Sequence, residues 1–144
     1  MNIKSIVFIL TLCGVLSLLC CKTKKVSGGE KEEFFPVYSN ATYVIPQRHP
    51  VHIDSAFVEG NILNLKVNYS GGCKKHFFQL NTDGVFAGTL PPLLPLFLDD
   101  TVKTDNCREF KEELIKFDVS KLKHPTQKEI VLKLADGQFI TYSY

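Results

Sequence analysis

The chain has 144 residues, of which 44% are hydrophobic and 22% are charged. This composition suits one globular domain and excludes a disordered or collagen-like chain. The formal net charge of +2 is too small to predict a nucleic-acid partner. The sequence contains no nucleophile elbow, P-loop, HExxH or GxGxxG motif, so it predicts neither an enzyme nor a bound cofactor.

Residues 1–20 are typical of an export signal. Lys4 is the only charged side chain among them, and an apolar run of 16 residues extends from Ile6 to Cys21. A membrane-spanning helix needs about 20 apolar residues, so this run fits the core of a signal peptide better. An ordinary cleaved signal and an uncleaved anchor helix are the alternatives.

The end of the apolar run, Leu18-Leu19-Cys20-Cys21, resembles a bacterial lipobox. With Cys21 as the lipidated residue, Leu18 stands three positions before it and the small Cys20 directly before it. Attachment of more than one acyl chain, palmitate among them, would give stable membrane anchoring. We therefore expect a lipoprotein of the cell envelope, on the outer rather than the inner membrane.

Residues 21–33 are predicted to be the lipid anchor and a flexible tether. The tether reads KTKKVSGGEKEE, in which Val26 is the only apolar residue. Such a segment cannot bury enough apolar surface to offset the entropy of ordering it. The folded domain is therefore expected to span residues 34–144.

The five cysteines divide into two groups. Cleavage before Cys21 removes Cys13 and Cys20, and lipid would occupy Cys21. Cys73 and Cys107 remain as an even pair in an oxidising compartment, which predicts a disulfide between them.

The domain is expected to be an immunoglobulin-like β-sandwich of about seven strands. Turn signals such as Glu59-Gly60-Asn61 and Asp136-Gly137 recur at short intervals, and apolar residues alternate with polar ones between them. In Ile62–Tyr69, for example, every second residue is apolar or aromatic. The predicted strands are 51–58, 62–69, 75–81, 129–134 and 138–144.

Two further segments are less simple. Leu90–Leu98 is apolar but contains three prolines, which predicts an edge strand or an extended loop. Asp105–Phe117 carries apolar residues at both helical and strand spacing. A strand over Leu114–Val119 is favoured, mainly because of the following resemblance.

The block from Ile53 to Leu80 resembles a group of uncharacterised Gram-negative lipoproteins. The shared pattern is Ser-Gly-Gly-Cys-x-x-His, then Asp-x-Cys, then Phe-Asp-x-Ser, found here at Ser70–His76, Asp105–Cys107 and Phe117–Ser120. The region 51–122 is also distantly similar to the C-terminal β-sandwich domain of NigD-like lipoproteins. The resemblance implies a fold and says little about activity. Relatives often carry His seven residues before the second Cys, where this chain has Asp100.

Cys73, His76, Asp105 and Cys107 form the one constellation of metal-ligand types. Thiolate and imidazole suit zinc or copper, and the starts of two strands could bring these residues together at one end of a sandwich. A disulfide with a histidine packed beside it is favoured over this metal site, because the compartment oxidises thiols. Asp100 in place of a histidine also weakens a site for a soft metal ion.

The remaining polar candidates predict no site. His49 and His52 flank a proline and are expected to be solvated, and His124 is expected to lie exposed in a turn. Asp99, Asp100 and Asp105 lack the spacing of a calcium loop, so a solvated acidic loop is expected there. The overall prediction is a non-enzymatic binding or structural module, with metal binding as the alternative.

Overall fold

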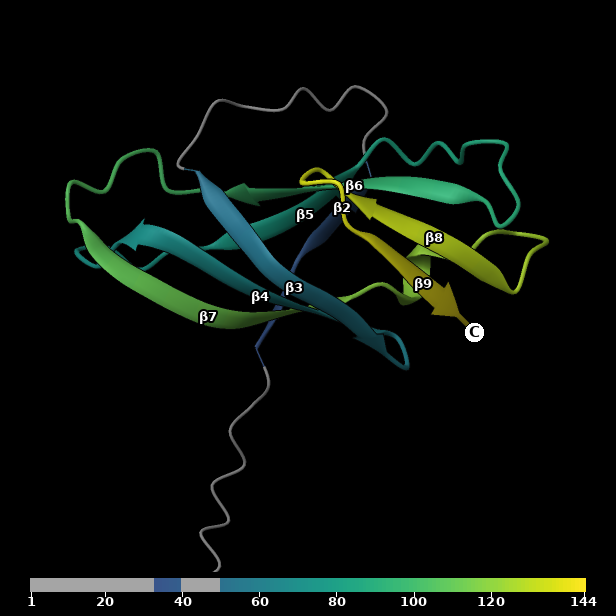
Figure 1. The fold of residues 1–144 in the computed structure, drawn as a ribbon, viewed down its shortest axis with the longest axis horizontal. Coiled ribbons are helices and arrows are strands. Elements are labelled where there is room, and N and C mark those ends of the chain that lie inside the picture. Colours follow the sequence, from purple (N-terminus) through teal and green to yellow (C-terminus); the bar gives the residue numbers. More distant parts are fainter. Residues whose placement is uncertain (1–32, 40–49) are drawn as a thin grey trace, which may run out of the picture. The chain divides into compact units, whose positions relative to one another are not determined.

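The computed structural model describes residues 33–39 and 50–144. These ranges form two packed β-sheets (Figure 1). The one helical element among them is a 3-10 turn, η2 (Ser120–Leu122), and none of their helices is long and apolar enough to cross a membrane. The strands are β1 (Phe34–Phe35), β2 (Val37–Ser39), β3 (Val51–Glu59), β4 (Ile62–Gly71), β5 (Phe78–Thr82), β6 (Leu93–Asp100), β7 (Glu109–Asp118), β8 (Glu129–Leu134) and β9 (Phe139–Ser143).

The first sheet has the strand order β1-β7-β4-β3 and the second has the order β2-β5-β6-β8-β9. The chain crosses from one sheet to the other at Pro36, so that β1 pairs with β7 and β2 pairs with β5. These two pairs and β6–β8 are parallel, which departs from the antiparallel sheets of an immunoglobulin domain. The predicted β-sandwich is confirmed, and β3 to β9 supply its seven longer strands.

Strand β4 shows why the sequence folds this way. Leu63, Leu65 and Val67 are fully buried and Tyr69 is nearly so, as the alternation predicts. Each fully buried leucine contributes about 1.5–3 kcal/mol by leaving water. Facing residues of the second sheet complete the core, among them Phe78, Leu80, Leu94, Leu96, Ile130, Leu132, Leu134, Ile140 and Tyr142.

Strand β6 corrects the prediction for the proline-rich segment. It is neither an edge strand nor a loop, because it lies inside the second sheet between β5 and β8. Among the named strands, its first half, Leu93–Leu96, pairs with β8, and its second half, Phe97–Asp100, pairs with β5; Leu93 also forms an isolated bridge with Ala87. Pro95 therefore has a partner strand on one side only, which removes the conflict with its missing N–H donor.

Strand β7 resolves the ambiguous segment as the favoured strand, although it begins at Glu109 rather than Leu114. The residues at helical spacing, Phe110, Leu114 and Phe117, lie on two opposite faces of this strand. Phe110 and Leu114 are exposed on the outer face, with 65% and 56% of their surface accessible, whereas Phe117 is fully buried on the inner face.

Candidate functional site

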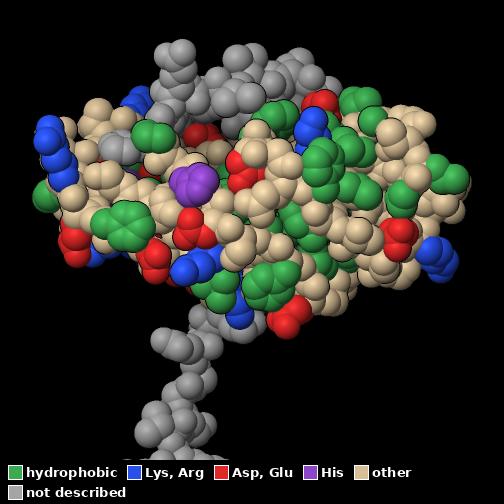
Figure 2. Space-filling view, in the orientation of Figure 1, with side chains coloured by type: hydrophobic (Ala, Val, Ile, Leu, Met, Phe, Trp, Pro, Cys, Tyr) green, Lys and Arg blue, Asp and Glu red, His purple; other side chains and the backbone are tan. Residues whose placement is uncertain are grey.

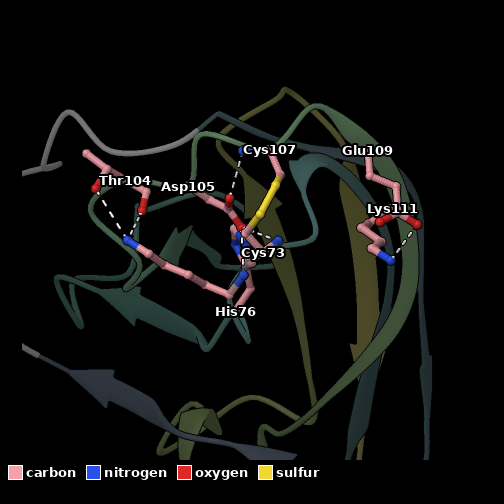
Figure 3. The surroundings of a disulfide bond; sticks show 8 residues. Cys73, His76, Thr104, Asp105, Cys107, Glu109 and Lys111 are labelled. Carbon is pink, nitrogen blue, oxygen red and sulfur yellow. Dashed lines mark hydrogen bonds and ion pairs between the residues drawn. A yellow bond between two sulfur atoms is a disulfide. The ribbon is translucent and has the colours of Figure 1, made fainter.

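The disulfide predicted between Cys73 and Cys107 is present and links the ends of two neighbouring strands (Figure 3). Strands β4 and β7 pair as far as Gly71 opposite Glu109, and the cysteines lie just beyond that pair. Their Cα atoms are 5.6 Å apart, well within the reach of a disulfide. The disulfide therefore joins the ends of β4 and β7 just beyond the last hydrogen-bonded pair of residues.

Asp105 lies beneath the disulfide and holds the backbone on both sides of it (Figure 3). Its Oδ2 accepts the N–H groups of Cys73 at 3.1 Å and Lys74 at 3.0 Å, and its Oδ1 accepts that of Cys107 at 2.9 Å. The bond from Cys107, followed by those from Lys74, His76 and Cys73, holds the pKa of the Asp105 carboxyl far below its usual range despite burial.

His76 lies between two carboxylates inside the domain. Its Nδ1 is 2.5 Å from Oδ2 of Asp100, and its Nε2 is 3.2 Å from Oδ2 of Asp105. The side chains of His76 and Asp100 have 1% and 0% of their surface exposed. Each ring nitrogen of His76 therefore lies within hydrogen-bonding distance of a buried carboxylate. We call His76, Asp100 and Asp105 the His76 cluster.

Tyr69 and Gly71 pack closely around the His76 ring. The ring of Tyr69 lies 4.4 Å from it, centroid to centroid, and the Tyr69 hydroxyl donates to Oε1 of Glu113 at 2.6 Å. Burial, together with Glu113, raises the pKa of Tyr69. A Cβ atom on Gly71 would lie 2.6 Å from His76 Nε2, so only glycine leaves room for the ring.

The prediction of a solvated acidic loop is wrong. Asp99, Asp100 and Asp105 are all buried. Each has hydrogen bonds that compensate for lost water: Asp100 accepts the backbone N–H of Val102 at 3.0 Å, and Asp99 accepts the side-chain amide of Gln79 at 3.2 Å. The aspartates are therefore part of the domain's internal structure.

The four predicted metal-ligand residues do come together. Donor atoms of Cys73, Asp105 and Cys107 lie within 4.8 Å of one another, and His76 contacts Asp105. The two sulfur atoms are bonded to each other, however, and zinc is bound by the thiolate form. With the disulfide formed, Cys73, Cys107 and Asp105 can hold the adjoining ends of β4 and β7 together and order the backbone next to each cysteine.

The other predicted residues lie apart from this cluster. His52 is exposed, as expected, with its Nε2 3.8 Å from Asp54. His124 is half-buried rather than exposed, because its Nδ1 accepts the backbone N–H groups of Thr126 and Gln127 and its ring packs on Phe86. His49 and the predicted lipidation residue Cys21 lie outside the described residues.

Sequence reasoning did not assign Tyr69, Gly71 or Asp100 to the cluster. The alternation in Ile62–Tyr69 predicts only that Tyr69 shares a face with Leu63, Leu65 and Val67, and the Ser-Gly-Gly sequence at Gly71 is typical of a turn. Asp100 stands where relatives carry histidine, and that substitution was the available signal for a special position.

No family model matches this chain, and no curated protein matches it either. Several solved structures resemble it, among them the following two. One is a NigD-like immunity protein from Bacteroides caccae, with a TM-score of 0.51 and 18% identity over 76% of this chain and 58% of that one. The other is a toxin-related protein from Parabacteroides distasonis, with a TM-score of 0.47 and 16% identity over 77% and 61% of the two chains.

The chain thus spans less than two thirds of the length of either structure. Similarity at this level of identity concerns the fold. It agrees with the resemblance of residues 51–122 to NigD-like lipoproteins. The chain is distantly similar to NigD-like proteins and shares their β-sandwich fold.

Proposed function

We propose that this protein is a lipid-anchored envelope protein whose β-sandwich binds a partner protein without catalysing a reaction. The observation that carries the proposal is the outer face of the first sheet. Four large hydrophobic side chains are exposed on it, at 43–65% of their surface: Phe34, Phe57, Phe110 and Leu114. We call this surface the outer face.

The register of the strands places these side chains together. Phe57 lies opposite Asn64, Asn64 opposite Lys116, and Lys116 opposite Phe34, so one row crosses all four strands. Asn64 is 97% covered in the middle of that row. Exposed aromatic residues on a flat surface are typical of protein interfaces.

Charged residues lie between the hydrophobic ones. Lys66 and Glu112 form an exposed ion pair at 3.6 Å, and Leu114 lies opposite Lys66. Figure 2, seen from the side on which β3 and β9 lie, shows hydrophobic, acidic and basic side chains intermingled on the surface. Charged side chains interspersed among aromatic anchors suit a protein partner better than a lipid surface. The solved neighbour described as an immunity protein is compatible with a role in protein binding.

Site-specific photocrosslinking tests the proposed face. A photoreactive residue at position 114 should form a discrete adduct in the intact envelope, and an excess of purified wild-type protein should abolish it. The double variant Phe57→Ser/Leu114→Ser should fail to compete, whereas Phe139→Ser, which alters an exposed phenylalanine of the other sheet, should compete fully. Competition by both variants, or no adduct at position 114, would refute the proposed face.

The anchor is tested separately. Cys21→Ala should release the protein from the membrane fraction, because Cys21 is the residue proposed to carry the acyl groups. Cys20→Ala is the matched control and should stay in that fraction, since alanine is also small. Retention of Cys21→Ala in the membrane would show that Cys21 is not the anchor.

The second candidate function is binding of zinc or copper by the reduced protein. The proximity of Cys73, Asp105 and Cys107 favours it, with His76 behind Asp105. The four hydrogen bonds that Asp105 accepts count against it, because a metal would have to displace some of them. Stoichiometric zinc binding that appears on reduction and disappears in Cys73→Ser would support this function.

A further inference from the structure

A cavity of about 590 Å³ lies at the edge of the sandwich where the chain crosses between the sheets. It is bordered by β1 and β2 on one side and by η2 on the other. Its volume falls in the range of about 300–1,000 Å³ that is usual for small-molecule sites. Its apolar walls come from Phe35, Pro36, Val37, Phe86, Leu94 and Leu122. We call it the edge cavity.

The rim of the edge cavity is positively charged. Lys121 and Lys123 line it and are exposed, and Asp118 is the one acid among its described lining residues. Asp118 already accepts the backbone N–H of Ser120 at 2.9 Å. The two ammonium groups thus exceed the carboxylate by one charge.

The two rim lysines lie in η2 and directly after it. Lys121 lies within η2, and the Lys123 ammonium is 5.0 Å from the centroid of the Tyr144 ring. Both lysines, after hydrogen bonding by Ser120, help to lower the pKa of Asp118, which agrees with their closeness to this rim. A ligand with a hydrocarbon body and a carboxylate head would place the body against the apolar walls and the head beside Lys121 and Lys123.

We propose that the edge cavity binds a small amphipathic carboxylate, with its hydrocarbon body between Phe35, Phe86 and Leu122 and its carboxylate at Lys121 and Lys123. This site lies on different residues from the outer face, so it is independent of the proposed partner binding. Decanoate is a suitable probe, and 1-decanol is its uncharged counterpart.

The chain contains no tryptophan, so Phe86→Trp gives a single indole fluorophore in the cavity wall. The full chain carrying this change and Cys21→Ala, which keeps acyl groups off the protein, is titrated with each probe. Decanoate should change the fluorescence saturably, and its affinity should exceed that of 1-decanol by about tenfold, because an ionic contact strengthens a hydrogen bond.

Neutralising the rim should remove this preference. In the same background, Lys121→Gln/Lys123→Gln should bind the two probes equally. Lys103→Gln, an exposed lysine outside the cavity, should keep the tenfold ratio. Ser39→Phe, at an exposed position of the cavity wall, should weaken both probes together.

Three results would overturn the proposal: no saturable response to decanoate, equal affinity for decanoate and 1-decanol in the reporter protein, or a tenfold preference that survives loss of both rim lysines. Circular dichroism of each variant shows whether the sandwich is intact. Should Phe86→Trp fail to fold, calorimetric titration of the tryptophan-free protein measures the same ratio.

Discussion

His76 Nδ1 and Asp100 Oδ2 lie 2.5 Å apart inside the domain, although 24 residues separate them in the sequence. Asp100 ends β6 in the second sheet, while His76 stands before β5 and packs against Tyr69 of the first sheet. The contact therefore ties the start of β5 to the end of β6 within the second sheet, and the packing of His76 on Tyr69 connects this pair to the first sheet.

Replacing His76 by alanine should lower the free energy of unfolding by about 3–5 kcal/mol, because Asp100 would lose its ring partner while still buried. Urea unfolding followed by circular dichroism measures this loss. His52→Ala removes an exposed histidine and should change stability by less than about 0.5 kcal/mol. Equal effects of the two substitutions would show that the buried pair contributes little.

Gly71→Ala should also destabilise the domain, by about 1–3 kcal/mol, because the added methyl group would lie 2.6 Å from His76 Nε2. Gly88→Ala is the control, since an added Cβ there meets nothing within 4 Å. Thermal unfolding of the two variants should therefore differ clearly. A Gly71→Ala protein as stable as Gly88→Ala would contradict the close fit around the ring.

Removing the disulfide by Cys73→Ser/Cys107→Ser should reduce stability by roughly 3.8 kcal/mol, the chain-entropy value for a separation of 34 residues. The wild-type protein in reductant should match the double variant. If reductant destabilised the double variant as much as the wild type, the loss would come from another cause.

Stability should fall in acid through Asp105. Its pKa in the folded state is lowered from about 3.8, so the unfolded chain takes up a proton first as the pH falls. This contribution is present above pH 3.8 and is lost progressively below it. Asp105→Asn should be less stable at neutral pH and show a shallower decline below pH 4. An unchanged slope in that variant would argue against Asp105 as the acid-sensitive group.

The core of the fold could be predicted because alternation of apolar and polar residues within a single strand identifies its buried face. The alternation in Ile62–Tyr69 predicted that Leu63 and Leu65 share one face, and both are buried. Strand β6 could not be predicted, because the tolerance of Pro95 depends on which half of the strand each neighbour covers.

The candidate site was only half predictable for the same reason. The disulfide could be predicted because only Cys73 and Cys107 remain in the domain after processing and an exported chain enters an oxidising compartment. The burial of Asp105 depends on backbone donors at Cys73 and Lys74, 32 and 31 residues away, which no local pattern reveals. Without these distant donors, the sequence around Asp99, Asp100 and Asp105 is typical of a solvated acidic loop.

The most direct test of a lipid-anchored, disulfide-clamped module is the intact mass of the processed protein, alkylated before and after reduction. Cys73 and Cys107 should take up the reagent only after reduction, and Cys21 should carry the mass of its acyl groups. Alkylation of both cysteines without reduction, accompanied by one equivalent of bound metal, would contradict this prediction, as would a processed protein without acyl mass on Cys21.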